Sequence, residues 1–105
     1  MTQDIQKEIA NILRQLIDTY HAQRVFLFGS AANDSFGPDS DLDFLVVKED
    51  VPESGPARAR QVRTLVAKRL PADFLVFRPS ELEERLRLGD PFLRDVIAKG
   101  RLLYG

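Results

Sequence analysis

Three aspartates stand where two apolar segments of the chain begin. Asp41 and Asp43 open the segment DLDFLVV (41–47), and Asp73 opens the segment DFLVF (73–77). Residues i and i+2 of a β-strand point to the same side, so Asp41 and Asp43 are expected to project together, with Cα atoms roughly 6.5 Å apart. Aspartate is disfavoured in strands, so two on one strand face are informative, although a merely solvated pair is the competing interpretation.

These acids predict a site for a hard divalent cation if the two segments are neighbouring strands. Their three carboxylates would then meet at one edge of the sheet, whereas Asp73 would otherwise be a turn or capping acid after Pro71. The chain has no cysteine and one histidine, which leaves carboxylates as its only plentiful metal ligands. Such oxygen ligands suit Mg²⁺ or Mn²⁺, whose shells are completed by water and phosphate oxygens. Asp41, Asp43 and Asp73 are therefore the predicted catalytic and metal-binding residues.

A Gly29-Ser30 turn follows another apolar segment, RVFLF (24–28), and provides a candidate phosphate site. Glycine lets a ligand approach the backbone because no Cβ blocks it, and the first amides of a following helix attract anions. On its own, such a pair is more often only a turn. Ten residues separate it from Asp41, however, and a phosphate cradle beside a carboxylate cluster is what phosphoryl or nucleotidyl transfer requires.

The spacing of apolar residues and turn formers indicates the elements that position these groups. A Ser80–Glu83 capping box and an Asp90-Pro91 helix start predict two short helices near the C-terminus, the second ending at Gly100. The expected order is helix 3–21, strand 24–28, loop 33–40, strand 41–47, loop 48–56, helix 57–70, strand 73–77, the two short helices, and an edge strand 101–104. Because helices and strands interleave, the predicted class is α/β (α+β): a small mixed β-sheet of three or four strands with helices packed mainly on one face.

Length and composition limit the classes of protein to consider. The 105 residues suit one domain, 1–105, and 44% hydrophobic with 30% charged residues is an ordinary globular composition. Lys and Arg total 15 against 16 Asp and Glu, so the net charge of −1 gives no strong signal for nucleic-acid binding. The N-terminal segment is amphipathic rather than a secretory signal, and no run reaches the roughly 18 apolar residues of a membrane span. We expect a cytoplasmic protein with no membrane partner.

The spaced motif resembles the signature of the polymerase-beta-like nucleotidyltransferase superfamily. Gly29-Ser30, ten residues and then Asp41-Leu42-Asp43 carry the resemblance, and the stretch SDLDFLVV (40–47) is similar to the minimal nucleotidyltransferases of that superfamily. The resemblance covers roughly residues 25–105. It implies a small mixed sheet, metal binding by Asp41 and Asp43, completion of the site by Asp73, and triphosphate binding by Gly29 and Ser30. The implied reaction is attack of a hydroxyl on the α-phosphorus of ATP or another NTP, with pyrophosphate leaving.

The resemblance also implies a protein partner. Minimal members often pair with a helical HEPN-type toxin, so the chain would be an antitoxin that transfers AMP to a tyrosine hydroxyl of that partner. Many members carry Gly-Ser-Arg-Ala-Arg-Gly, whereas residues 29–34 are Gly-Ser-Ala-Ala-Asn-Asp, and Lys48, Arg58 or Arg60 are candidate replacements for the two arginines. One alternative is therefore a catalytically weak module that neutralises a partner by binding it. Another is an α/β domain whose acids are incidental.

Overall fold

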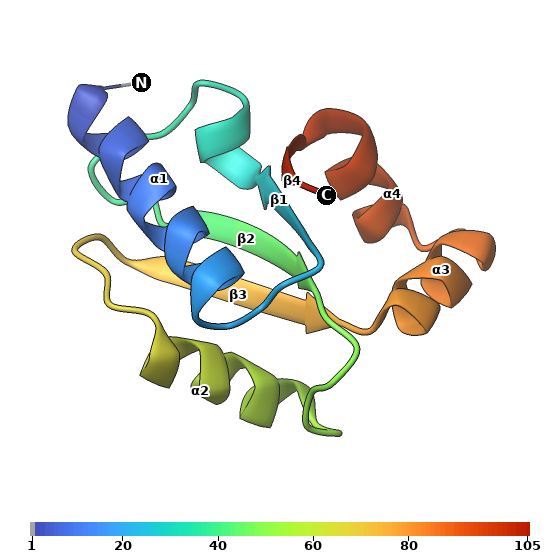
Figure 1. Ribbon diagram of the computed structural model, residues 1–105. Coiled ribbons are helices and arrows are strands. Elements are labelled where there is room, and N and C mark those ends of the chain that lie inside the picture. The colour runs from blue at the N-terminus through green and yellow to red at the C-terminus, as the bar shows by residue number, and fades with distance from the viewer. Residues whose placement is uncertain (1) are drawn as a thin grey trace.

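A four-stranded mixed β-sheet forms the centre of the computed structural model, which describes residues 2–105 (Figure 1). The strands lie in the order β3-β2-β1-β4 and span β1 (Arg24–Phe28), β2 (Leu42–Val47), β3 (Ala72–Phe77) and β4 (Arg101–Tyr104). Strand β1 is antiparallel to β2 and to β4, whereas β2 is parallel to β3. The predicted mixed sheet, its α+β class and the late edge strand are confirmed.

Four α-helices and one 3₁₀ turn join and cover the strands of the described chain. They are α1 (Gln3–Asp18), the 3₁₀ turn η1 (Gly29–Ala32), α2 (Gly55–Leu65), α3 (Pro79–Arg87) and α4 (Pro91–Lys99). Within residues 2–105, none of the helices has the length and apolar character needed to cross a bilayer.

The second long helix is shorter than predicted because segment 66–71 leaves the helical path. Gln15 on α1 donates to the carbonyl of Ala67 at 2.7 Å and accepts from its N–H at 2.8 Å. The Glu8 carboxylate accepts from the Leu70 N–H at 2.8 Å. These partners lie more than fifty positions away in the sequence, so local spacing does not reveal them.

The starts of the two C-terminal helices differ in how well the sequence predicted them. The Ser80–Glu83 capping box is wrong, since α3 begins at Pro79 and the Glu81 carboxylate accepts from the Arg78 N–H at 2.8 Å. Proline lacks an N–H and has a fixed φ, so it suits the first helical position. The cap of α4 is confirmed, because Asp90 accepts from the backbone N–H of its third residue at 3.0 Å.

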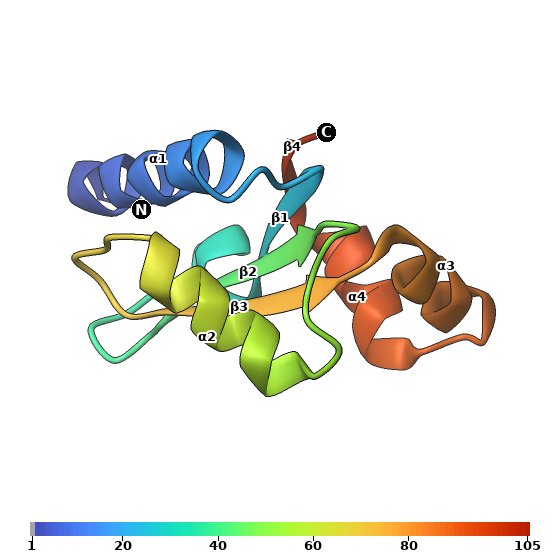
Figure 2. The ribbon, with the colours of Figure 1, turned by 60° about the horizontal axis from the view of Figure 1, so that its bottom comes forward.

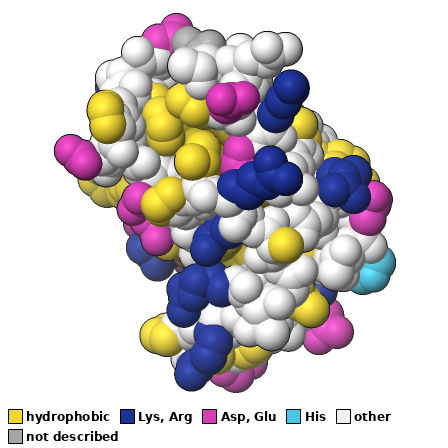
Figure 3. Space-filling view, turned by 90° about the vertical axis from the view of Figure 1, so that its left-hand side faces the viewer, with side chains coloured by type: hydrophobic (Ala, Val, Ile, Leu, Met, Phe, Trp, Pro, Cys, Tyr) yellow, Lys and Arg dark blue, Asp and Glu magenta, His cyan; other side chains and the backbone are white. Residues whose placement is uncertain are grey.

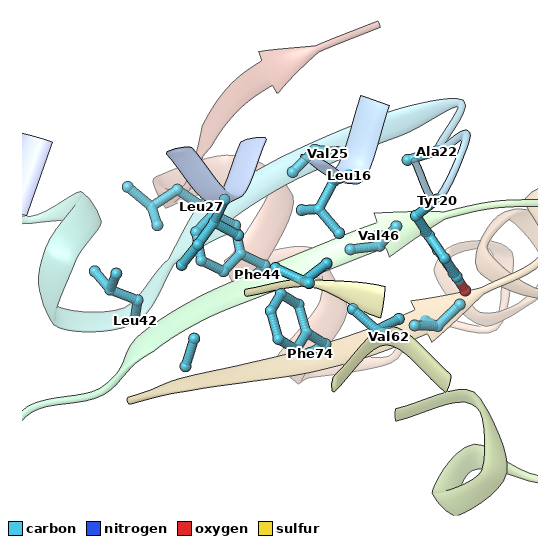
Figure 4. Close-up of a cluster of buried hydrophobic side chains, with 14 of the residues drawn as sticks. Leu16, Tyr20, Ala22, Val25, Leu27, Leu42, Phe44, Val46, Val62 and Phe74 are labelled. Carbon is cyan, nitrogen blue, oxygen red and sulfur yellow. The ribbon is translucent and has the colours of Figure 1, made fainter. Parts of the chain in front are cut away.

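Helices α1 and α2 cover one face of the sheet, over a core of alternate strand residues. Phe44 on β2 stacks on Phe74 of β3 with ring centroids 5.6 Å apart, and Leu16 of α1 and Val62 of α2 complete this core (Figure 4). Strand residues at odd and even positions point to opposite faces, so the residues between these point to the other side.

The other face is covered only in part, by α3 and α4. Phe26 and Leu45 form a second core there with Leu82 of α3 and Leu93 of α4. Figure 2 shows α1 and α2 towards the left and α3 and α4 grouped at the right. The expectation of helices mainly on one face thus holds for the two longest helices and not for α3 and α4, because β1 and β2 are apolar on both faces.

Candidate active site

Two of the predicted acids lie side by side at the beginning of the parallel strands. Asp43 pairs in register with Asp73 on β3 and, on its other side, with Phe28 at the end of β1. Residues in register on parallel strands point to the same face. Asp43 and Asp73 therefore share the face that α3 and α4 cover in part, and Asp73, on the edge strand, is exposed.

Asp41 lies just outside the strand in which it was predicted. Strand β2 begins at Leu42, whose N–H donates to the Pro71 carbonyl at 3.0 Å, and the Asp41 side chain is exposed. Even so, Asp41 belongs to the same electrostatic group. Burial raises the pKa of the Asp43 carboxyl above its ordinary value, and the negative charges of Asp73 and Asp41 raise it further.

The donor set fits a cation that is shared with a bound phosphate group. Among residues 2–105, no three Asp, Glu, His or Cys side chains converge closely enough to enclose a metal ion by themselves. Magnesium does not require such a cage, since it commonly binds through one or two carboxylates and completes its shell with water and substrate phosphates. A cation beside Asp43 would also relieve the repulsion among the three acids.

Gly29 lies directly against this acid cluster. Its φ is +71°, a conformation that side chains rarely adopt, and a Cβ at this position would collide with the Asp43 carboxylate. Both the backbone turn and the close approach therefore require glycine. The predicted short helix after it exists as the 3₁₀ turn η1, in which Ser30 is half-buried.

The three candidate replacement cations lie away from the acids. Arg58 is buried and donates to both oxygens of Glu81, at 2.7 and 3.0 Å. Lys48 follows the far end of β2, with its ammonium 4.4 Å from the ring centroid of Tyr20. Arg60 lies on α2, which packs on the opposite face of the sheet. None of these three therefore serves the site at Asp43.

A cleft beside Gly29 brings in residues that the sequence did not indicate. We call it the η1–α4 cleft, and its volume is about 510 Å³. Its lining is Phe28, Gly29, Ala32, Asn33, Phe92, Asp95, Val96, Lys99 and Gly100. Phe92 and Lys99 come from the opposite end of the chain from Gly29. No spacing pattern links them to the Gly-Ser turn, so only the packing of α4 reveals this neighbourhood.

Comparisons with known proteins show the family to which the chain belongs. Residues 6–104 match the family model described as a nucleotidyltransferase domain. The chain therefore belongs to the nucleotidyltransferase domain family, which indicates nucleotidyl transfer as the class of reaction.

A solved structure supports the same fold. It is that of a candidate nucleotidyltransferase from Sulfolobus solfataricus, with a TM-score of 0.56, 22% sequence identity, and coverage of 80% of this chain and 81% of that one. At this identity the likeness speaks for the fold alone. No protein with a curated description matches the sequence.

Proposed function

We propose that this chain transfers a nucleoside monophosphate, AMP from ATP, to a hydroxyl group in a reaction that depends on Mg²⁺ or Mn²⁺. The observation that carries the proposal is the register of Asp43 with Asp73 beside a glycine that no other residue can replace. The cation would neutralise charge on the triphosphate and on the departing pyrophosphate.

The position of each candidate residue suggests its role in the reaction. Asp41 and Asp43 would hold the cation, and Gly29 and Ser30 would lie along the triphosphate. Asp73 stands on the exposed edge strand, where its carboxylate would accept the proton of the attacking hydroxyl. The hydroxyl oxygen forms a bond to the α-phosphorus as the bond from that phosphorus to the bridging oxygen of pyrophosphate breaks.

The proposed acceptor is a tyrosine of a HEPN-family toxin in the cytoplasm, with the chain as its antitoxin. The family resemblance motivates this choice. The exposure of Asp73 supports it, because a large protein partner can reach an edge strand more easily than a buried cleft.

The experiment mixes the protein with α-labelled ATP, Mg²⁺ and the product of the neighbouring gene. We expect label on the partner, its loss with EDTA, and its loss in Asp43→Asn. The matched control is Asp39→Asn, which removes the same charge from an exposed loop position. A tight complex without label, unchanged in Asp43→Asn, would instead establish the weakly catalytic binding module.

A further inference from the structure

The η1–α4 cleft has the size and the position expected of a nucleotide site. Its volume of about 510 Å³ lies in the range of small-molecule pockets, roughly 300–1,000 Å³. Gly29 belongs to the cleft lining and also lies against the Asp43 carboxylate, so the cleft adjoins the acid cluster at this residue.

The order of the strands assigns opposite sides of Asp43 to the two substrates. Asp73 lies on the edge strand β3, on one side of β2, whereas Gly29 and the cleft follow β1 on the other side. In-line displacement needs the attacking hydroxyl and the departing pyrophosphate on opposite sides of the α-phosphorus. An acceptor at Asp73 therefore places the departing pyrophosphate over Gly29.

The wall of the cleft carries an aromatic ring open to stacking. Phe92 is 51% exposed although it is a large apolar residue. Phe28 holds it by an edge contact, with ring centroids 5.7 Å apart and planes at 84°. Such a contact fixes the ring and leaves a face of Phe92 for a base, whose stacking on aromatic side chains is a common source of affinity.

The same wall carries a positive charge. Position 31 is a buried alanine, so the start of η1 brings no positive charge to the cleft. Lys99 lies in the cleft, and its ion pair with Asp95, at 3.0 Å, joins two exposed side chains. Exposed pairs of this kind are weak, so Lys99 can exchange Asp95 for a phosphate.

We propose that the η1–α4 cleft holds the nucleoside triphosphate, with the base against Phe92 and the terminal phosphates at Lys99. The inference rests on the proposed function in so far as the ligand is a nucleotide. It goes further by assigning the nucleotide to residues of α4.

Calorimetric titration of the full chain tests this with two probes, MgATP and magnesium tripolyphosphate. Phe92→Ala should weaken MgATP about tenfold and leave tripolyphosphate unchanged, because only the base is affected. Lys99→Gln should weaken both probes about threefold. Asp95→Asn should tighten both, since it removes a competing negative charge.

Controls separate the cleft from the exposed surface around it. Leu88→Ala and Arg94→Gln change exposed residues close to or on α4 that do not line the cleft, and both should bind like wild type. Phe92→Trp should retain MgATP binding, and circular dichroism checks that each variant is folded.

The outcomes distinguish this inference from the proposed function. Wild-type affinity for MgATP in both Phe92→Ala and Lys99→Gln overturns the cleft assignment, even if label transfer still depends on Asp43. If MgATP binding is weaker in these variants but the wild-type protein transfers no label to an acceptor, the nucleotide site in the cleft is supported and the proposed transfer reaction is refuted. Failure of the wild-type protein to bind MgATP refutes both.

Discussion

Gly29 combines two demands that no other residue type meets. A side chain there would be strained at a φ of +71° and would also collide with the Asp43 carboxylate. We expect Gly29→Ala to reduce nucleotidyl transfer at least about 100-fold, because displacement of the acid by even 1 Å is costly in catalysis. Urea unfolding should show a loss of roughly 1–2 kcal/mol from the left-handed backbone alone.

Gly55→Ala is the matched control for this change. A Cβ at Gly55 meets nothing within 4 Å, and the residue opens α2, where alanine is a better helix former. Activity and stability should therefore remain at wild-type levels or rise slightly. Equal behaviour of the two variants would show that the approach of Gly29 to Asp43 has no role.

The negative charge of Asp43 should destabilise the folded protein when no cation is bound. Burial and the charges of Asp73 and Asp41 raise its pKa, so the ionised form that prevails at neutral pH is disfavoured by folding. Because solvent screens a half-exposed group, Asp43→Asn should raise Tm in EDTA by only about 3 °C. Calorimetry should further show that Mg²⁺ stabilises wild type and not the variant. A lower Tm for Asp43→Asn in EDTA would contradict this account.

At the scale of residues, the sequence predicted those features of the candidate site that depend on neighbours along the chain. The spacing of Asp41 and Asp43 and the turn at Gly29 are local features. The meeting of Asp43 with Asp73 required only that two acid-led strands be neighbours. Phe92 and Lys99 could not be predicted as cleft residues, because their proximity to Gly29 depends on how α4 packs.

At the scale of elements, a partly buried ion pair and its hydrogen bonds join α2, β3 and α3. Arg58 of α2 donates to both Glu81 oxygens and to the Val76 carbonyl at 3.1 Å. The hydrogen bonds from Arg58, together with one from the Arg78 N–H, lower the pKa of Glu81 to about 2. Because the pKa is lower in the folded state, the Glu81 carboxylate stabilises the fold at pH values above its pKa in the unfolded chain, which is near 4.5. This stabilisation is lost as the pH falls towards 2.

Glu81→Gln should therefore destabilise the protein in a pH-dependent manner. At pH 7 we expect a loss of about 2 kcal/mol, less than for a fully buried pair because the Glu81 side chain is 35% exposed. The difference from wild type should shrink between pH 4.5 and 2 in urea titrations. Glu84→Gln, on the same helix with an exposed partner in Arg87, should leave the profile unchanged. A loss independent of pH would mean that shape, not charge, matters at Glu81.

Element boundaries were predictable only where their signals are local. The Asp90 cap of α4 follows from adjacent residues. The end of α2 does not, because Glu8 and Gln15 of α1 bind the backbone of segment 66–71. That segment leads directly into β3, so α1 helps to position Asp73 although it lies on the other face of the sheet.

At the scale of the whole molecule, incomplete cover of the sheet creates the site. Helices α1 and α2 close one face, whereas α3 and α4 leave the start of β2 and β3 open on the other. Figure 3 shows the end of the molecule at which these two strands begin, with acidic side chains at its left border and near its centre, and Lys and Arg side chains running from the upper right to the lower left. The sequence predicted the sheet but not this division of helices, because an amphipathic helix pattern does not say which face it covers.

The open face gives the acceptor a defined path. Leu75 lies two residues beyond Asp73 on the edge strand, points to the same side, and is 36% exposed. If a protein partner reaches Asp73 along β3, it must pass over Leu75. Leu75→Arg should then raise the KM for the partner about tenfold, as expected for a central apolar contact, and leave the affinity for MgATP unchanged. Leu65→Arg places the same charge at an exposed leucine of α2, on the covered side, and should have no effect. Equal transfer by Leu75→Arg and wild type would show that the partner approaches from another direction.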